Sequence, residues 1–200
     1  MPILGITGGV ATGKTAFSRE LQPRLGAGLF DADREAAAVI AGDAGAREEI
    51  ARHFGETIFS PDGALDRPGL RAAVFREEKQ RRALETILHP RIRAKWTALA
   101  QTARAENRWL IVDIPLLYET GAETHFDRIV VVACAAETQR RRLREIRALD
   151  EETALGMLAA QLDLLWKIEK ANHAVWNDAG LPCLREQAIL LGDCLLREYG

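Results

Sequence analysis

Residues 6–15 read ITGGVATGKT, and this stretch decides the fold. Gly8 is followed by four residues and then by Gly13, Lys14 and Thr15, which is the G-x-x-x-x-G-K-[ST] spacing of a phosphate-binding loop. Glycines let the backbone curl so that successive N–H groups point at phosphate oxygens, and the following helix adds the positive end of its dipole. We expect Lys14 to reach the β- and γ-phosphates and the Thr15 hydroxyl to bind Mg²⁺. The expected contacts with ATP are Gly8, Gly9, Val10, Ala11, Thr12, Gly13, Lys14 and Thr15.

The segments on either side of the loop test whether the match is accidental. Residues 2–6 form a short apolar run that ends in the glycine-rich turn, as expected of a buried parallel strand. After the loop, Phe17 and Leu21 are spaced i, i+4, as expected of a helix packed on that strand. The alternative is a glycine turn with a chance Gly-Lys-Thr, and the strand and helix weigh against it.

The composition of the 200 residues fits one domain with a small inserted part. A share of 48% hydrophobic and 28% charged residues is ordinary for a soluble globule, and a net charge of -2 argues against a dedicated nucleic-acid binder. No apolar run has the length of a membrane span, and no basic-then-apolar signal segment precedes the first strand, so we expect a cytoplasmic protein without a membrane partner. Cys134, Cys183 and Cys194 lack C-x-x-C spacing, which favours buried or idle thiols over disulfides or zinc.

Further apolar runs predict a sheet of five parallel strands in a three-layer α/β/α sandwich. Besides the first strand, we expect strands at residues 28–31, 109–114, 127–133 and 174–177. Pro23 and Gly26 are expected to stop the first helix. Residues 43–105 contain no strand candidate and are expected to be a helical insertion, interrupted at His89-Pro90 and carrying a turn around Pro61. One helix over residues 151–170 and a closing helix over residues 182–199 complete the pattern.

Carboxylates follow two of these strands. Asp31 and Asp33 come at the end of the second strand, and Asp113 comes near the end of the third. In an open parallel sheet the carboxyl ends of strands face the ligand crevice, so these acids are expected near the phosphate loop. Asp113 could orient Mg²⁺ through water. The alternatives stay open: Asp31 or Asp33 caps the helix that starts near Arg34, and Asp113 only bonds Thr15 or Lys14.

An arginine-dense helix follows the fourth strand, with arginines at residues 140–142, 144 and 147. A solvated helical face accounts for most charge runs. A lid at this place would instead supply cations that close over the transferred phosphoryl group.

Several segments together resemble the dephospho-CoA kinase family, and they occur in its order over nearly the whole chain. They are residues 6–15, FDAD at 30–33, HFGETIFSPDGALDR at 53–67, ILHPRIR at 87–93, DIPLLYETG at 113–121, ETQRRRL at 137–143, Gln161, Asn177 and Gly180. The phosphate loop is shared by many enzymes, whereas the Leu-His-Pro and Pro-Leu-Leu-x-Glu segments are more specific.

The resemblance implies transfer of the ATP γ-phosphoryl group to the ribose 3′-hydroxyl of dephospho-CoA, with ATP and Mg²⁺ as cofactors and a monomer or weak oligomer. It also implies sheet order 2-3-1-4-5, a single P-loop kinase domain, an acceptor-binding insertion at about residues 43–105 and a lid at about residues 137–170. By position, Asp33 is the candidate base, Lys14 and Arg142 complete the catalytic set, and Asn177 lies near the adenine. The residues expected to line or support the acceptor side are Asp33, His89, Pro115, Leu116, Leu117 and Glu119.

The chain departs from the family pattern at a few positions. Ala37 and Met157 stand where family members commonly have arginine, and Ile146 replaces the second arginine of Arg-Leu-x-x-Arg. Arg144 or Arg147 could substitute for it. Two alternatives therefore remain beside the kinase: another P-loop small-molecule kinase, and a low-activity nucleotide- or CoA-binding protein with a decayed lid.

Overall fold

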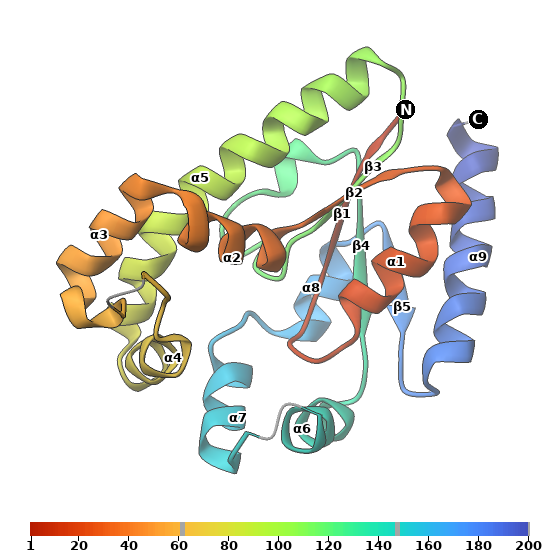
Figure 1. The fold of residues 1–200 in the computed structure, drawn as a ribbon. Helices are drawn as coiled ribbons and strands as arrows, with labels where there is room; N and C mark the ends of the chain where they lie inside the picture. The colour runs from red at the N-terminus through yellow and green to blue at the C-terminus, as the bar shows by residue number, and fades with distance from the viewer. Residues whose placement is uncertain (61–62, 147–148, 200) are drawn as a thin grey trace. The chain divides into compact units, whose positions relative to one another are not determined.

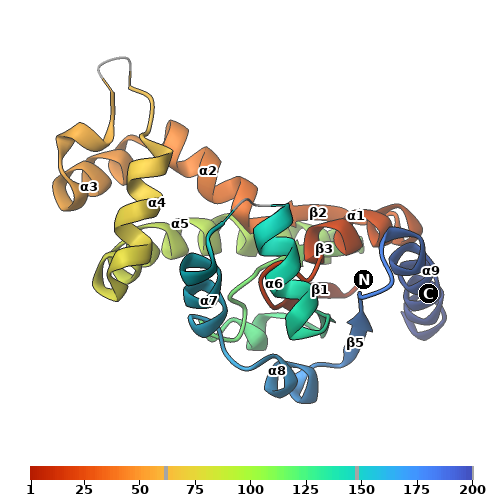
Figure 2. The ribbon, with the colours of Figure 1, turned by 90° about the horizontal axis from the view of Figure 1, so that it is seen from below.

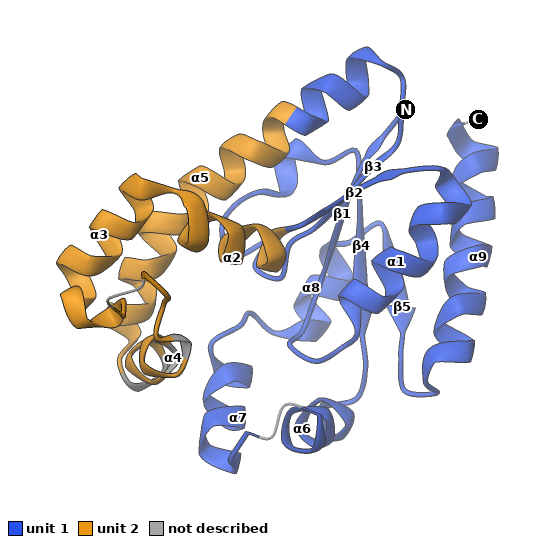
Figure 3. Ribbon diagram, viewed as in Figure 1, with its two compact units in different colours: residues 1–31, 99–200 blue, residues 32–98 orange. Residues whose placement is uncertain are grey.

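The structure, a computed structural model, describes residues 1–60, 63–146 and 149–199. Pro61 of the expected turn and Arg147 of the expected lid lie outside the described residues. The chain forms two compact units (Figure 3): the sheet unit, residues 1–31 with 99–200, and the helical unit, residues 32–98. Each unit is described by itself.

The sheet unit contains five strands that all pair in parallel (Figure 1). They are β1 (Ile3–Gly8), β2 (Gly28–Asp31), β3 (Leu110–Asp113), β4 (Arg128–Ala133) and β5 (His173–Trp176), in the order β2-β3-β1-β4-β5. This order and the α/β class confirm the prediction. Every residue of β1 and β3 is buried, which explains why their sequences are continuous apolar runs and not alternating ones.

Helices cover both faces of this sheet, with α1 (Lys14–Leu25) and α9 (Leu181–Tyr199) together on one of them. Phe17 and Leu21 of α1 pack in one core cluster with Leu4 and Ile6 of β1 and with Leu184 of α9. On the other face, the side chains of Leu117 and Phe126 lie against Gly5, and α8 (Leu164–Lys170) packs on β4. Figure 2 shows α8 and α9 from below, in a view turned by 90° from that of Figure 1.

The end of α1 differs from the expectation at Pro23, which does not stop the helix but lies in its last turn. Proline there removes a single hydrogen bond, and α1 continues to Leu25. Gly26 ends it with φ 59°, a left-handed conformation that glycine adopts without strain. The Ala27 N–H then donates to the Gln22 carbonyl at 3.1 Å, as in a Schellman motif.

The helical unit contains α2 (Ala32–Gly42), α3 (Ala44–Phe54), the 3₁₀ turn η1 (Glu56–Ile58), α4 (Arg67–Arg76) and most of α5 (Glu78–Ala105). Asp43 caps α3 by accepting from the Ala46 N–H at 2.8 Å. Arg91 of α5 bonds Glu49 of α3 at 2.8 Å, which ties these two helices together. The unit has no strand among its described residues, only an isolated bridge between Phe59 and Leu65.

The expected interruption at His89-Pro90 is wrong, because α5 runs through both residues without ending. An internal proline costs about 3 kcal/mol. Ile87, Leu88, Ile92 and Trp96 are all buried on this helix, and each large apolar side chain contributes roughly 1.5–3 kcal/mol on burial. The buried face therefore outweighs the proline.

The single helix expected at residues 151–170 is divided into α7 (Glu151–Ala159) and α8, after the arginine-rich α6 (Ala136–Glu145). Asp163 begins α8 by capping it, accepting from the Trp166 N–H at 2.9 Å. Between the two helices, the Leu162 N–H donates to Glu119 Oε1 at 3.1 Å and not to a carbonyl of the preceding turn, so the helical hydrogen bonds are interrupted there. No helix in the described ranges is long and apolar enough to span a membrane.

Candidate active site

The phosphate loop joins the end of β1 to the start of α1, and its glycines are required by geometry. Gly13 has φ 96°, and a Cβ placed on it would lie 2.3 Å from Asn177 Nδ2. A Cβ on Gly8 would lie 2.0 Å from the Val132 carbonyl oxygen of β4. A side chain at either position would therefore deform the loop.

Lys14 is the first residue of α1, and its side chain lies back over the loop. The Lys14 ammonium donates to the Gly9 carbonyl oxygen at 2.8 Å, and the residue is only 8% exposed. The Thr12 hydroxyl donates to the same carbonyl at 2.9 Å. A lysine at the positive end of a helix dipole makes this a site for an anion.

Thr15 and Asp113 bring two hard oxygen atoms together next to Lys14. The Thr15 hydroxyl donates to Asp113 Oδ2 at 2.9 Å, and Asp113 is buried as the last residue of β3. Asp113 lies opposite Ile6 of β1 and opposite Asp31 of β2 in the sheet register. A hydroxyl and a carboxylate fit Mg²⁺, which takes one or two protein oxygens and fills its octahedron with phosphate and water. Among the described residues, no group of three or more Asp, Glu, His or Cys side chains is placed to hold a metal ion.

Two glutamines hold the peptide groups of Val10 at the middle of the loop. Gln139 of α6 donates its Nε2 to the Val10 carbonyl oxygen at 2.8 Å, and the Val10 N–H donates to Gln161 Oε1 at 2.7 Å. Our sequence reasoning gave Gln139 no role. The sequence signal for Gln139 was its spacing of four residues from the apolar Leu143, which places both side chains on one face of a helix. In the structure both side chains are buried on α6.

Arg142 of α6 binds the backbone of the same loop. Its guanidinium donates to the carbonyl oxygens of Ala11 and Thr12 at 3.2 and 3.3 Å, and to that of Asn177 at 2.7 Å. Arg142 therefore holds the loop in this structure, and its contact with phosphate stays a prediction.

Ile146, Met157 and Arg144, the other positions that the sequence singles out in the expected lid, lie in different surroundings. Ile146 is 76% exposed. Met157 packs against the buried cluster of Val10, Leu143 and Ala154, so it joins α7 to the loop through apolar contact. Arg144 is exposed, 3.7 Å from Glu151.

Asn177 follows β5 and supports the phosphate loop. Its Nδ2 donates to the Thr12 carbonyl oxygen at 2.8 Å, and the residue is 6% exposed. The proximity of Asn177 to the adenine stays a prediction. In this structure its amide nitrogen is bonded to the phosphate loop.

The segment after β3 contains the four acceptor-side residues expected in this unit. The Pro115 carbonyl oxygen accepts from the Thr7 hydroxyl at 3.1 Å, and Leu116 is half-buried. Leu117 is fully buried over Gly5, so burial favours support over contact with a ligand. Glu119 Oε1 lies 2.6 Å from the ammonium of Lys167.

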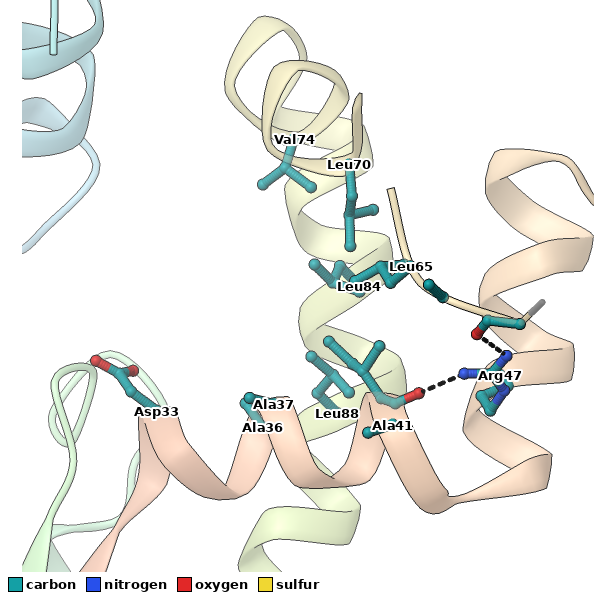
Figure 4. A pocket seen from close by; sticks show the side chains of 13 residues that line it. Asp33, Ala36, Ala37, Ala41, Arg47, Leu65, Leu70, Val74, Leu84 and Leu88 are labelled. Carbon is teal, nitrogen blue, oxygen red and sulfur yellow. Dashed lines mark hydrogen bonds between the residues drawn. The ribbon is translucent and has the colours of Figure 1, made fainter. Parts of the chain in front are cut away.

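The helical unit holds a pocket of about 600 Å³ between α2, α4 and α5 (Figure 4). Asp33, exposed in the first turn of α2, stands at one end of the lining. Arg47 stands at the other end of the lining. Its guanidinium donates to the carbonyl oxygens of Ile40 and Gly63 at 3.1 and 2.7 Å, and it lies over the Phe59 ring. The stretch between them is apolar, made of Ala36, Ala37, Ile40, Ala41, Leu65, Leu70, Val74, Leu84 and Leu88. Sequence reasoning missed Arg47, because no local pattern separates it from the other surface arginines.

His89, the remaining acceptor-side residue, is half-buried on α5. Burial lowers the pKa of its imidazole, against the opposing effect of Glu85. The side chain is therefore neutral near pH 7, and can donate with one ring nitrogen and accept with the other.

A parallel five-stranded sheet with a Gly-Lys-Thr loop between β1 and α1 defines a P-loop kinase of the α/β nucleotide-kinase class. The shikimate kinase from Acinetobacter baumannii in complex with shikimate shares this fold, with a TM-score of 0.51 and 17% identity over 99% of this chain and 94% of that one.

The family model described as dephospho-CoA kinase matches residues 2–182. The dephospho-CoA kinase of Anaeromyxobacter dehalogenans is 43% identical over 91% of this chain and 86% of its own length. The structure of dephospho-CoA kinase from Campylobacter jejuni superposes with a TM-score of 0.71 and 26% identity, covering 99% of this chain and 98% of that one. The chain therefore belongs to the dephospho-CoA kinase family.

Proposed function

We propose that the protein transfers the γ-phosphoryl group of ATP to the ribose 3′-hydroxyl of dephospho-CoA, giving CoA and ADP. This is the last step of coenzyme A biosynthesis, and a cytoplasmic monomer or weak oligomer is part of the proposal. The observation that carries it is a complete phosphate loop, with Lys14 and the Thr15–Asp113 pair in place, in a chain of this family.

On the ATP side, the loop N–H groups and Lys14 bind the triphosphate. Lys14 exchanges its bond to the Gly9 carbonyl for phosphate oxygens, where its charge offsets the negative charge of the transition state. Thr15 and Asp113 are the residues that would hold Mg²⁺, which when bound neutralises charge on the phosphates. Arg142 keeps the loop in shape and, in this proposal, adds positive charge near the phosphates.

On the acceptor side, Asp33 accepts the proton of the 3′-hydroxyl or aligns its oxygen for attack. Phosphoryl transfer asks mainly for positioning and charge neutralisation, so one aligned carboxylate is sufficient. This role of Asp33 is supported by its position in the chain, two residues beyond the carboxyl end of β2.

The helical unit is the proposed binding place for the rest of the acceptor. The pocket wall between Asp33 and Arg47 is apolar, which suits the methyl and methylene groups of a pantetheine arm. Along α2, residues 33 to 41 span about 12 Å, enough for part of an extended arm. A neutral His89 would contribute hydrogen bonds without charge.

Two observations favour the alternative of a nucleotide- or CoA-binding protein with little activity. Met157 makes apolar contacts where the family commonly has arginine, and Arg142 is bonded to three carbonyl oxygens. Direct detection of CoA formed by the purified protein from dephospho-CoA and Mg-ATP tests the proposal. A Lys14→Met protein is the control. Absence of CoA, or turnover of another hydroxyl acceptor in its place, would overturn the assignment.

A further inference from the structure

A buried ion pair in the sheet unit is not used by the chemistry described above. Lys167 of α8 is fully buried, and its ammonium lies 2.6 Å from Oε1 of Glu119, whose side chain is 15% exposed. Removing two charges from water is costly, and a pair of well-packed apolar residues is often at least as stabilising. The pair therefore points to a task beyond stability.

The bonding partners of Glu119 indicate that task. Glu119 Oε1 also accepts from the Leu162 N–H at 3.1 Å. The preceding residue, Gln161, accepts from the Val10 N–H of the phosphate loop at 2.7 Å. Two consecutive residues of the link between α7 and α8 are thus bonded to Glu119 on one side and to the phosphate loop on the other.

The same contacts argue against a direct bond between Glu119 and the acceptor. Oε1 is shared by Lys167 and Leu162, and Oε2, which has no hydrogen-bond partner among the described residues, is too deeply buried for a ligand to reach it in this structure. The neighbouring rings of Tyr118 and Trp166 meet edge to face, with centroids 5.4 Å apart, so the two segments also pack beside the ion pair. Glu119 is therefore a positioning residue.

We propose that the Glu119–Lys167 pair positions the phosphate loop. It fixes the link between α7 and α8 so that the Gln161 amide holds the Val10 peptide in the orientation needed for ATP. The pair thus sets nucleotide affinity through Gln161 and has no direct contact with either substrate. The assignment of the acceptor rests on the proposed function, whereas this effect on nucleotide binding does not.

The test measures Mg-ATP affinity by calorimetry without acceptor, so it does not depend on which acceptor the protein uses. Lys167→Met keeps the length of the side chain and removes its charge, and Glu119→Gln keeps an acceptor for Leu162. We expect each to weaken Mg-ATP binding about tenfold, as loss of an ordered hydrogen bond would. Lys170→Met, an exposed lysine one turn further along α8, is the matched control and should bind as the wild type does.

Further variants separate positioning from a loss of folding. The double variant Glu119→Gln/Lys167→Met buries no unpaired charge, so it should fold and still bind Mg-ATP about tenfold more weakly. Gln161→Ala should have the same effect, and Lys167→Met added to Gln161→Ala should add less than about twofold. The KM for dephospho-CoA should stay within about twofold in all folded variants, because the pair does not touch the acceptor. Wild-type Mg-ATP affinity in the folded double variant, or a rise confined to the KM for dephospho-CoA, would overturn the proposal.

Discussion

Replacing Gly13 with alanine should damage the phosphate loop in two separable ways. Gly13 has φ 96°, where an L-residue is strained by roughly 1–2 kcal/mol. The new methyl would also lie 2.3 Å from Asn177 Nδ2, so Asn177 must leave its 2.8 Å bond to the Thr12 carbonyl. Leaving a buried pair unsatisfied costs about 1–3 kcal/mol. The free energy of unfolding should therefore fall by about 2–5 kcal/mol in total.

Thermal and denaturant unfolding of matched variants measures the two effects apart. Gly180 has φ 88°, and no atom lies within 4 Å of the place that an alanine methyl would take, so Gly180→Ala carries backbone strain without crowding. The Tm of Gly13→Ala should fall by about 4–20 °C, at roughly 2–4 °C per kcal/mol for a chain of this size. The Tm of Gly180→Ala should fall by less than half as much.

A double-variant cycle then tests the assigned contact. Asn177→Ala removes the atom that the methyl would strike, so Gly13→Ala should cost about 1–3 kcal/mol less in that background. Equal losses for Gly13→Ala and Gly180→Ala, or strict additivity with Asn177→Ala, would refute the reasoning from geometry.

Three other outcomes follow from the site. Asp33→Asn should retain Mg-ATP binding while turnover falls about 10²- to 10⁴-fold, and unchanged turnover would reduce Asp33 to a role in starting α2. Asp113→Asn should raise the Mg²⁺ concentration for half-maximal activity roughly tenfold, with Asp163→Asn as control; an unchanged Mg²⁺ titration would contradict the metal role. Burial lowers the pKa of both His89 and His173, so the unfolded chain takes up protons first as the pH falls. The two histidines therefore make their full contribution to the free energy of unfolding above about pH 6.5 and a smaller one below it. His89→Gln should reduce the fall of the urea midpoint between about pH 7 and 5.5. A wild-type midpoint that rises on acidification would contradict this.

The sheet and the loop could be predicted because their signals are local. A buried parallel strand is an apolar run, and the phosphate loop needs its glycines at a fixed spacing. The boundaries of β2 agree with the sequence prediction at both ends. The break between α7 and α8 could not be read in the same way, since it depends on bonds to Val10 and Glu119, 151 and 43 residues away in the chain.

The same difference between local and long-range signals applies to the site residues. Lys14 and Thr15 are recognised from the motif that contains them, but the supporting roles of Gln139, Arg142 and Asn177 depend on contacts with distant backbone. Pro90 is a further case, where a local rule predicts a break and the buried face of α5 overrides it. Local chemistry therefore identifies the candidate binding residues, and tertiary packing decides which residues hold them in place.

The two glutamines that bind Val10 have a consequence for how α6 and α7 can move. Gln139 stands near the start of α6 and Gln161 just after α7, and between them Arg142 and Met157 also contact the loop or the cluster around Val10. A swing of both helices away from the loop would break both glutamine bonds and release the Val10 peptide. Because Arg142 bonds the loop as well, a displacement of α6 would disturb the phosphate loop at the same time.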